Sequence, residues 1–146
     1  MDKFCSYAAV MELPWSLHPQ LAADTVPVRD LPLCAALLND DANYPWLILV
    51  PRRADIVEIV DLDDGDRVQL MREIALASRA LKAVTACHKL NVAALGNAVP
   101  QLHVHVIARQ TTDAAWPHPV WGRVPRKPHE AAARDRLVVE LRNKLA

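Results

Sequence analysis

The stretch that decides the fold is QLHVHVIAR, residues 101–109. Polar and apolar residues alternate along it, and the side chains of a β-strand point alternately to its two faces. The pattern predicts a strand over Leu102–Arg109 whose core face carries Leu102, Val104 and Val106. The opposite face carries Gln101, His103 and His105, spaced about 7 Å apart along the strand. The stretch therefore predicts two imidazoles and an amide in one row.

The residues just before this strand predict a second strand and a long helix. Leu90–Leu95 is predicted as a strand, joined to residues 102–109 by a short turn at 96–100. A helix is predicted over residues 64–88, with Asp63 or Asp64 placed to cap its start. Its buried stripe is predicted from the apolar residues that recur every three to four positions, which are Val68, Met71, Ile74, Ala75, Leu81 and Val84.

Two further strands are predicted nearer the N-terminus, at Leu33–Asn39 and Tyr44–Val50, with a hairpin turn at NDDAN (39–43). Residues 52–62 are predicted to be a linker with a possible short strand, and residues 17–25 a short helix or turn. The final segment, 129–146, is predicted as a closing helix. Strands, then a long helix, then two strands indicate an α+β fold with an antiparallel sheet rather than repeated βαβ units.

Composition limits the class of protein. The chain has 146 residues, so we expect one domain over residues 1–146. Apolar residues make up 52% and charged residues 23%, as in ordinary globular proteins. Lys plus Arg equals Asp plus Glu at 17 each, which argues against a nucleic-acid partner, and three glycines leave little material for a glycine-rich nucleotide loop.

A cytoplasmic location is expected from three observations. The longest apolar run, Trp46–Val50, is too short to cross a membrane. The first 15 residues lack the long apolar segment of a signal peptide. The three cysteines, Cys5, Cys34 and Cys87, form no CxxC pair and are interpreted as reduced thiols.

The histidine pair allows three interpretations from the residues alone. A neutral imidazole serves as nucleophile, base or proton donor near neutral pH. An alternating polar face also occurs where a strand simply meets water. A His-x-His pair on a strand is in addition a recurrent pair of zinc or iron ligands, which requires a third ligand. The candidates for it stand at no diagnostic spacing, and they are His18, Cys87, His88, His118 and the acidic residues.

The longer segment GNAVPQLHVHVIAR, residues 96–109, resembles the signature of the histidine triad (HIT) superfamily. Gly96 falls at the family's glycine, Asn97 at its usual glutamine, and His103 and His105 at its second and third histidines. Gln101 stands at the first histidine position. The resemblance covers roughly residues 30–110, leaving 111–146 as a C-terminal extension in which AWPHPVWG (115–122) resembles one bacterial branch.

The resemblance implies an antiparallel sheet of about five strands with one long helix and a C-terminal helix, paired into a homodimer. It implies a hydrolase or transferase that acts at the α-phosphorus of nucleoside 5′-phosphate derivatives, with diadenosine polyphosphates or adenosine phosphoramidates as substrates. His103 is then the nucleophile that forms a covalent nucleotidyl-imidazole, His105 a donor to phosphoryl or leaving-group oxygens, and Gln101 the orienting residue. No metal and no cofactor are required, since hydrogen-bond donors stabilise the charge that develops on phosphorus.

The substrate-binding residues that follow from this interpretation are Asn39 near the ribose and the backbone N–H groups of the 96–100 turn, with Pro100 excluded because it has no N–H. Asn91 and Asn97 are candidates for phosphate or ribose contacts, or for bonds to their own backbone. The predicted set is Asn39, Asn91, Gly96, Asn97 and Ala98.

Three departures from the family pattern put the catalytic rate in question. Gln101 cannot carry a proton on and off, Ala98 lacks the usual hydroxyl, and Trp46 occupies the region where the family often has a histidine. A nucleotide-binding module with little catalysis, and a metal-dependent enzyme with His-x-His ligands, are therefore the alternatives.

Further residues have two interpretations each. Trp116 and Trp121 form either an aromatic wall over the polar face or a packing contact of the tail. Arg109 is interpreted as a polyphosphate contact or as part of a solvated loop.

Overall fold

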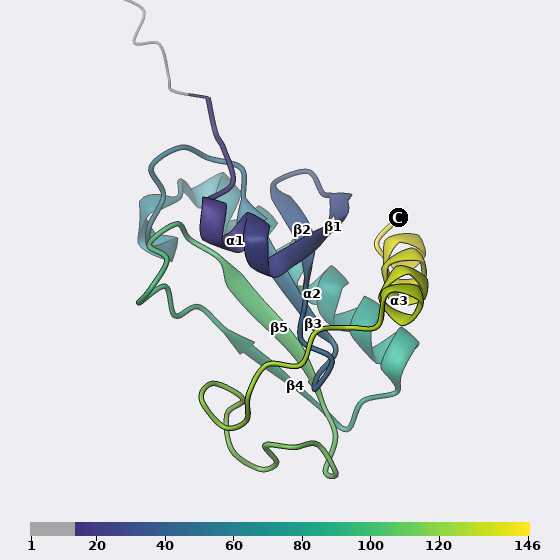
Figure 1. Cartoon of the computed structure of the whole chain (residues 1–146). Helices are drawn as coiled ribbons and strands as arrows, with labels where there is room; N and C mark the ends of the chain where they lie inside the picture. The colour runs from purple at the N-terminus through teal and green to yellow at the C-terminus, as the bar shows by residue number, and fades with distance from the viewer. Residues whose placement is uncertain (1–13) are drawn as a thin grey trace, which may run out of the picture.

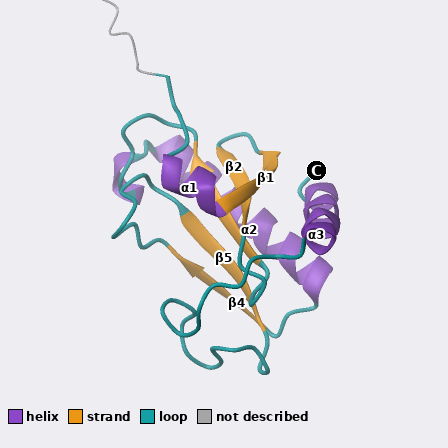
Figure 2. Ribbon diagram, in the orientation of Figure 1, coloured by secondary structure: helices purple, strands orange, loops and turns teal. Residues whose placement is uncertain are grey.

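The computed structural model describes residues 14–146, which form one sheet and three α-helices (Figures 1 and 2). The elements in chain order are α1 (Pro19–Asp24), β1 (Thr25–Asp30), β2 (Cys34–Asn39), β3 (Trp46–Pro51), the 3-10 helix η1 (Ile59–Asp61), α2 (Asp64–Thr85), β4 (Lys89–Ala93), β5 (Val104–Arg109) and α3 (Ala131–Lys144).

The five strands form an antiparallel sheet in the order β1-β2-β3-β5-β4. Strand β5 lies between β3 and β4, so its residues have neighbours on both sides. His105 stands opposite Ile48 of β3 and Ala93 of β4. The predicted α+β fold, with an antiparallel sheet, one long helix and a C-terminal helix, is confirmed.

The two faces of the sheet contact different elements. Leu102, Val104 and Val106 lie in an apolar core with residues of α2 and α3, as the alternation predicted. The other face packs against α1 and the tail that follows β5, through a second apolar cluster that includes Leu21 and Val120. Figure 1 shows α2 behind the sheet and α1 in front of it. His105 of β5, and His103 just before this strand, therefore lie under α1 and the tail, on the face away from α2.

Helix α2 is confirmed, and its predicted buried stripe is confirmed in part. Leu81 is buried, and Ile74 and Val84 are half-buried against the core, but the stripe does not include Val68 and Met71. Val68 and Met71 are 53% and 65% exposed, whereas the buried positions are Leu70, Glu73, Ala77, Ala80 and Leu81. The large apolar residues misled the prediction because the helix face against the sheet carries small alanines and one carboxylate. Both oxygens of Glu73 accept backbone N–H groups at the start of β2, from Leu33 at 2.7 Å and Cys34 at 2.8 Å.

The ends of α2 have local causes. The side chain of Asp63 accepts the N–H of Asp66 and caps the helix start, which decides between the two predicted caps. The helix stops at Thr85 rather than at residue 88 because Ala86 adopts a left-handed conformation with φ 48°. His88 therefore lies beyond the helix, and Lys89 opens β4.

Three local predictions require correction. Strand β1 was not predicted, because a proline such as Pro27 is unusual inside a strand. The structure accommodates it because β1 is at the edge of the sheet and its register shifts between Pro27 and Arg29. The linker 52–62 forms no strand and contains η1 instead. The connection between β4 and β5 is not a short turn but a loop over residues 94–103, which frames the candidate site.

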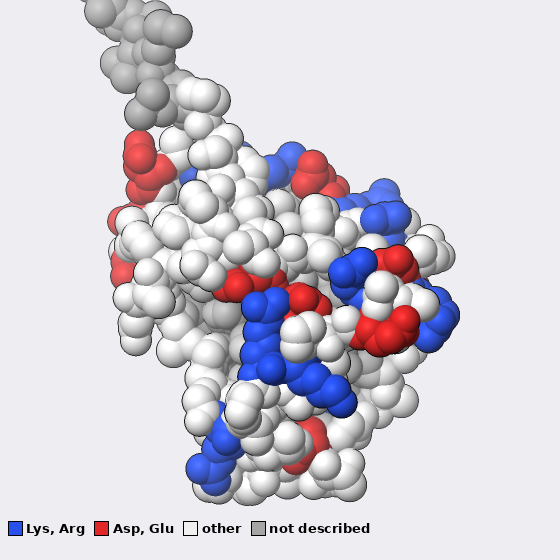
Figure 3. All heavy atoms as spheres, viewed as in Figure 1, with Lys and Arg blue, Asp and Glu red and all other residues white. Residues whose placement is uncertain are grey.

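Charged side chains of both signs are interspersed on the face that Figure 3 shows. Within residues 14–146, no helix combines the length and the apolar character that a membrane span requires. Cys34 and Cys87 are free thiols. Cys5 and the N-terminal stretch that was compared with signal peptides fall outside the described residues, apart from Pro14 and Trp15.

Candidate functional site

His103 and His105 lie side by side in a cavity of about 440 Å³. Their ring centroids are 4.9 Å apart, and the residues are 7% and 6% exposed. This volume is in the range of small-molecule sites. The other residues that line the cavity come from α1, the ends of β2 and β3, the 94–103 loop and the tail, and they are Gln20, Leu21, Asp24, Asn39, Trp46, Leu95, Gly96, Asn97, Ala98, Val99 and Trp121.

One hydrogen bond decides which nitrogen of His103 is free. The Nδ1 atom of His103 lies 2.7 Å from the backbone carbonyl oxygen of Gln101. A carbonyl oxygen only accepts, so Nδ1 carries the hydrogen and donates it. In the neutral ring the lone pair is therefore on Nε2. His103 thus offers the cavity a nitrogen that is able to act as a nucleophile.

His105 has the opposite arrangement. The indole Nε1–H of Trp46 donates to Nδ1 of His105 at 2.9 Å. An indole only donates, so Nδ1 of His105 is the acceptor and the hydrogen of the neutral ring is on Nε2. Burial, and next the charge of His103, lower the pKa of His105 to about 4. His105 is therefore a neutral hydrogen-bond donor at physiological pH.

Two indole rings enclose His105. The centroids of Trp46 and Trp121 lie 5.4 Å and 5.2 Å from its ring centroid, in edge-to-face arrangements. Trp121 is 39% exposed, so it forms the outer wall of the cavity. Of the two interpretations of Trp121, the structure supports the aromatic wall. Trp116 instead packs on His88, with centroids 5.4 Å apart.

The 94–103 loop forms the rim next to the histidines. Gly96 has φ 71°, which L side chains rarely adopt, and a Cβ there would lie 3.5 Å from the carbonyl oxygen of Val99. Within the described part of the chain, no protein acceptor is recorded for the N–H groups of Gly96, Asn97, Ala98 and Val99. Four of the predicted substrate-binding residues reach the cavity, namely Asn39, Gly96, Asn97 and Ala98.

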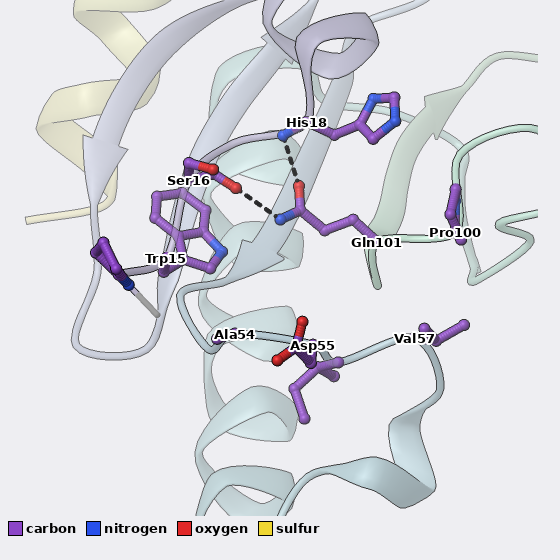
Figure 4. A pocket seen from close by; sticks show the side chains of 10 residues that line it. Trp15, Ser16, His18, Ala54, Asp55, Val57, Pro100 and Gln101 are labelled. Atoms are coloured by element: carbon purple, nitrogen blue, oxygen red, sulfur yellow. Dashed lines mark hydrogen bonds between the residues drawn. The ribbon is translucent and has the colours of Figure 1, made fainter. Parts of the chain in front are cut away.

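The Gln101 side chain is not where the alternation placed it. Its Oε1 accepts the backbone N–H of His18 at 2.9 Å, and its Nε2 donates to the carbonyl of Ser16 at 2.9 Å (Figure 4). It lines a separate pocket of about 360 Å³ that also contacts Trp15 and Asp55. The prediction was wrong because β5 begins at Val104, so strict alternation does not extend back to Gln101. The contact of this residue with His103 is through its backbone.

Asn91 and Arg109 are also outside the cavity. Arg109 is 1% exposed and donates to Asp113 at 2.7 Å and to Oδ1 of Asn91 at 2.7 Å. The Asn91 side chain is thus engaged by a buried guanidinium, and Arg109 is not available to polyphosphate. The structure thus places neither residue at the histidine cavity, because a buried Arg109–Asp113 ion pair and its bond to Asn91 depend on residues that a local pattern does not show.

Sequence reasoning missed the wall contributed by α1, namely Gln20, Leu21 and Asp24. A short helix carries no pattern that shows which distant strand it covers. Trp46 was noticed in the sequence because it occupies the region where the family often has a histidine. That position did not reveal its hydrogen bond to His105.

The tail reaches the site through an ionic anchor. Arg126 donates to Asp24 of α1 at 3.3 Å and to Asp40, after β2, at 3.1 Å. The backbone N–H of His129 also donates to Asp40 at 3.0 Å, and this bond together with Arg126 lowers the pKa of Asp40. The anchor follows Trp121 by a few residues and holds the tail over the histidine face.

A metal site receives no support from the geometry. Among residues 14–146, no group of three or more His, Cys, Asp or Glu side chains gathers in a way that fits an ion. The non-acidic candidates for a third ligand do not line the cavity of the histidine pair, and they are His18, Cys87, His88 and His118. Of the acidic candidates, Asp24 lines it, but its oxygens accept hydrogen bonds from Gln20 and Arg126.

The model of the HIT domain family matches residues 20–112. A histidine triad protein from Bradyrhizobium japonicum is 57% identical, with a TM-score of 0.90, and the match covers 92% of this chain and 100% of that one. No curated protein matches the chain.

Two more solved structures are similar. A histidine triad protein from Sinorhizobium meliloti is 41% identical over 89% of this chain and 96% of its own, with a TM-score of 0.87. One from Marinobacter aquaeolei is 41% identical over 90% of this chain and 96% of its own, with a TM-score of 0.88. The family model spans more than half of the chain and these bacterial relatives match nearly all of it, so the chain belongs to the HIT domain family.

Proposed function

We propose that this chain is a hydrolase or transferase that cleaves nucleoside 5′-phosphate derivatives at the α-phosphorus, with His103 as the nucleophile. Membership of the HIT domain family supports a nucleotide-binding hydrolase or transferase role. The observation that carries the finer proposal is the bond between Nδ1 of His103 and the Gln101 carbonyl, because it leaves Nε2 free on a residue that lines the cavity. Diadenosine polyphosphates and adenosine phosphoramidates are the proposed substrates.

The reaction has two displacements. The Nε2 lone pair of His103 forms a bond to the α-phosphorus while the bond to the leaving group breaks, and that bond's electron pair leaves with the departing atom. A water oxygen then bonds to phosphorus, the N–P bond breaks with its electron pair returning to Nε2, and the water's proton passes to solvent. Gln101 positions the nucleophile through its carbonyl, which also stabilises the positive charge that the ring gains in the first displacement.

Phosphate binding is assigned to the loop rim and to His105. The N–H groups of Gly96, Asn97, Ala98 and Val99 have no protein acceptor in the described chain, and these residues line the cavity, so we assign them the role of a small anion nest. The Nε2–H of His105 adds a side-chain donor. The nucleoside is proposed to bind against Asn39 and the cavity walls formed by Leu21 and Trp121.

The proposal is tested by incubating the protein with diadenosine tetraphosphate and with an adenosine phosphoramidate. We expect AMP release by the wild type and by His118→Ala, a control residue that lies outside the cavity, and no release by His103→Ala. Mass spectrometry after a rapid quench is expected to find AMP on His103. Tight AMP binding without turnover of any compound would instead identify a nucleotide-binding module, and normal turnover without the adduct would exclude the covalent route.

The proposal extends to the assembly and location of the protein. We propose that residues 1–146 form one domain that works as a homodimer in the cytoplasm, without a nucleic-acid or membrane partner, as the balanced charge and the family resemblance imply. Sedimentation at several protein concentrations tests the dimer, and a single monomeric species at all of them would contradict it.

A further inference from the structure

The hydrogen-bond partners of His105 limit what this residue does for a leaving group. Its Nδ1 accepts the indole N–H of Trp46, so the only ring hydrogen of the neutral form is on Nε2. If Nε2 gave up that hydrogen, the ring would become an anion, because Trp46 cannot supply a proton to Nδ1. The cation is also disfavoured, since it would place an N–H of His105 against the N–H of Trp46.

Burial acts in the same direction. His105 is only 6% exposed. This burial is the larger cause, and the charge of His103 the smaller cause, that lowers the pKa of His105 to about 4. At neutral pH about one molecule in a thousand then carries the cation. His105 is thus able to donate a hydrogen bond but not to release a net proton.

No other described residue of the cavity supplies that proton. Besides His105, the titratable side chains among the described residues that line it are Asp24 and His103. Both carboxylate oxygens of Asp24 act as acceptors, Oδ2 from Gln20 at 2.8 Å and Oδ1 from Arg126 at 3.3 Å, so this side chain offers the leaving group no hydrogen. His103 uses its one hydrogen on the Gln101 carbonyl and its lone pair on phosphorus. The amide of Gln101 lies in the other pocket.

We propose that Trp46 is a positioning residue that holds His105 as a neutral Nε2–H donor, so that the site cleaves substrates whose leaving group departs as an anion much faster than those whose leaving group must first gain a proton. This inference rests on the proposed function and narrows its substrate class. It selects nucleoside polyphosphates and excludes alkyl phosphoramidates as good substrates.

The bond changes of the first displacement explain the selection. When the leaving group is a phosphate chain, the P–O bond breaks and its electron pair stays on an oxygen that is stable as an anion, stabilised further by the Nε2–H of His105. When the leaving group is an alkylamine, the P–N bond breaks only if the nitrogen has gained a proton, because an amine anion is too basic to form in water. The cavity has no group that delivers this proton at neutral pH.

The first test measures the dependence of rate on the leaving group. We compare kcat/KM at pH 7 for diadenosine tetraphosphate, an adenosine 5′-(N-alkyl)phosphoramidate, and aryl esters of AMP made with phenols of increasing basicity. We expect the polyphosphate to be cleaved about a hundredfold faster than the phosphoramidate, which is the range that general acids contribute where they act. We also expect the aryl esters to slow steeply as the phenol becomes more basic.

The outcomes separate this inference from the proposed function. Turnover of none of the compounds by folded protein overturns both. Turnover with a shallow dependence on the phenol, or with the phosphoramidate cleaved as fast as the polyphosphate, overturns the inference alone, because a proton must then reach the leaving group in the site.

The second test observes the tautomer directly, by nitrogen-15 NMR of the histidine rings. In the wild type we expect His105 to carry its hydrogen on Nε2 and His103 on Nδ1, and the reverse for His105 would overturn the inference whatever the activity. In Trp46→Phe, which keeps an aromatic ring but loses the N–H, we expect His105 to become a mixture of tautomers. For the polyphosphate, kcat should fall about tenfold, the equivalent of one hydrogen bond, with little change in KM.

Two matched controls accompany Trp46→Phe. Trp121→Phe removes an indole that contacts the His105 ring without a recorded hydrogen bond to it, so the His105 tautomer should stay as in the wild type. Trp116→Phe changes an indole outside the cavity and should leave activity unchanged. An unaltered His105 tautomer in folded Trp46→Phe would overturn the role of Trp46. If that variant does not fold, the wild-type NMR and the leaving-group series still decide the inference.

Discussion

Two neighbouring imidazoles, one at the end of the 94–103 loop and one in β5, have different chemistry because each has a different partner. The Gln101 carbonyl accepts from Nδ1 of His103, whereas the Trp46 indole donates to Nδ1 of His105. The partners, rather than the histidines themselves, fix one ring with a free Nε2 lone pair and the other with an Nε2–H. A pair of histidines two residues apart therefore combines the free lone pair that the proposed nucleophile needs with an N–H that donates a hydrogen bond.

The lowered pKa of His105 predicts a loss of stability in mild acid. The unfolded residue takes up a proton as pH falls through about 6.5, whereas the folded residue resists protonation until about pH 4. The contribution of neutral His105 is thus fully present above about pH 6.5 and is lost as pH falls toward 4. By linkage it amounts to roughly 3 kcal/mol.

Urea unfolding between pH 4.5 and 7.5 measures this effect. We expect the free energy of unfolding of His105→Gln to fall less over this range than that of the wild type, while His118→Gln follows the wild type. Parallel curves for His105→Gln and the wild type would show that His105 titrates alike in the folded and unfolded chains.

At the scale of elements, two buried charges connect segments that are far apart in the chain. Glu73 of α2 binds the backbone at the start of β2, and Arg109 of β5 binds Asp113 in the tail. Both are nearly inaccessible to solvent, at 2% and 1% exposure. Each of these buried charges stabilises the packing of its two segments only while its hydrogen-bond partners are present, because a buried charge without a partner is destabilising.

Glu73→Ala leaves two buried N–H groups, those of Leu33 and Cys34, without an acceptor. We expect a loss of roughly 2–5 kcal/mol of unfolding free energy, since each unsatisfied buried donor costs about 1–3 kcal/mol. Thermal and urea unfolding measure it against Glu140→Ala, an exposed glutamate of α3. A loss as small as that of the control would mean that water replaces the carboxylate.

Arg109→Ala leaves the Asp113 carboxylate buried without its partner, since that side chain is only 7% exposed. We expect destabilisation of roughly 3–5 kcal/mol, the range for breaking a buried pair by removing one partner. The exposed pair of Arg134 and Asp135 provides the control, and Arg134→Ala should change unfolding by less than about 1 kcal/mol. Equal effects of the two variants in urea unfolding would contradict the burial argument.

At the scale of the whole molecule, one face of the sheet forms the main apolar core and the other face carries the candidate site. One face meets α2 and α3 across an apolar core, and the other face carries the histidines under α1 and the tail. The second face is completed by residues distant in sequence, held by Arg126 between Asp24 and Asp40. Since Arg126 is 44% exposed, this anchor positions the tail more than it stabilises the fold.

Trp121→Ala opens the outer wall of the cavity without removing a core side chain. We expect KM for the nucleotide to rise about tenfold, since loss of aromatic contact costs roughly 1–1.5 kcal/mol, with a smaller change in kcat. Steady-state kinetics measures both constants. Val60→Ala, at a residue that is 78% exposed, is the control and should leave both constants unchanged. An unaltered KM in Trp121→Ala would remove Trp121 from the binding wall.

The sequence by itself determined the order of the main elements and the side of β5 on which each residue lies. Alternation in residues 102–109 separates Val104 and Val106 from His103 and His105 because neighbouring side chains of a strand must point to opposite faces. The cap at Asp63 was similarly readable, since it depends on contacts within a few residues. Such features are local, so local sequence specifies them.

Only the tertiary structure decided what covers the histidine face and which partners the two rings have. The Trp46 bond joins residues 59 positions apart, and α1 and Trp121 reach the cavity from opposite ends of the described chain. Gln101 and Asn91 were both predicted as site residues. In the structure their side chains instead accept hydrogen bonds from His18 and Arg109, outside the cavity. Periodicity states which way a side chain points, but a hydrogen bond also depends on the distant atoms that folding brings within reach.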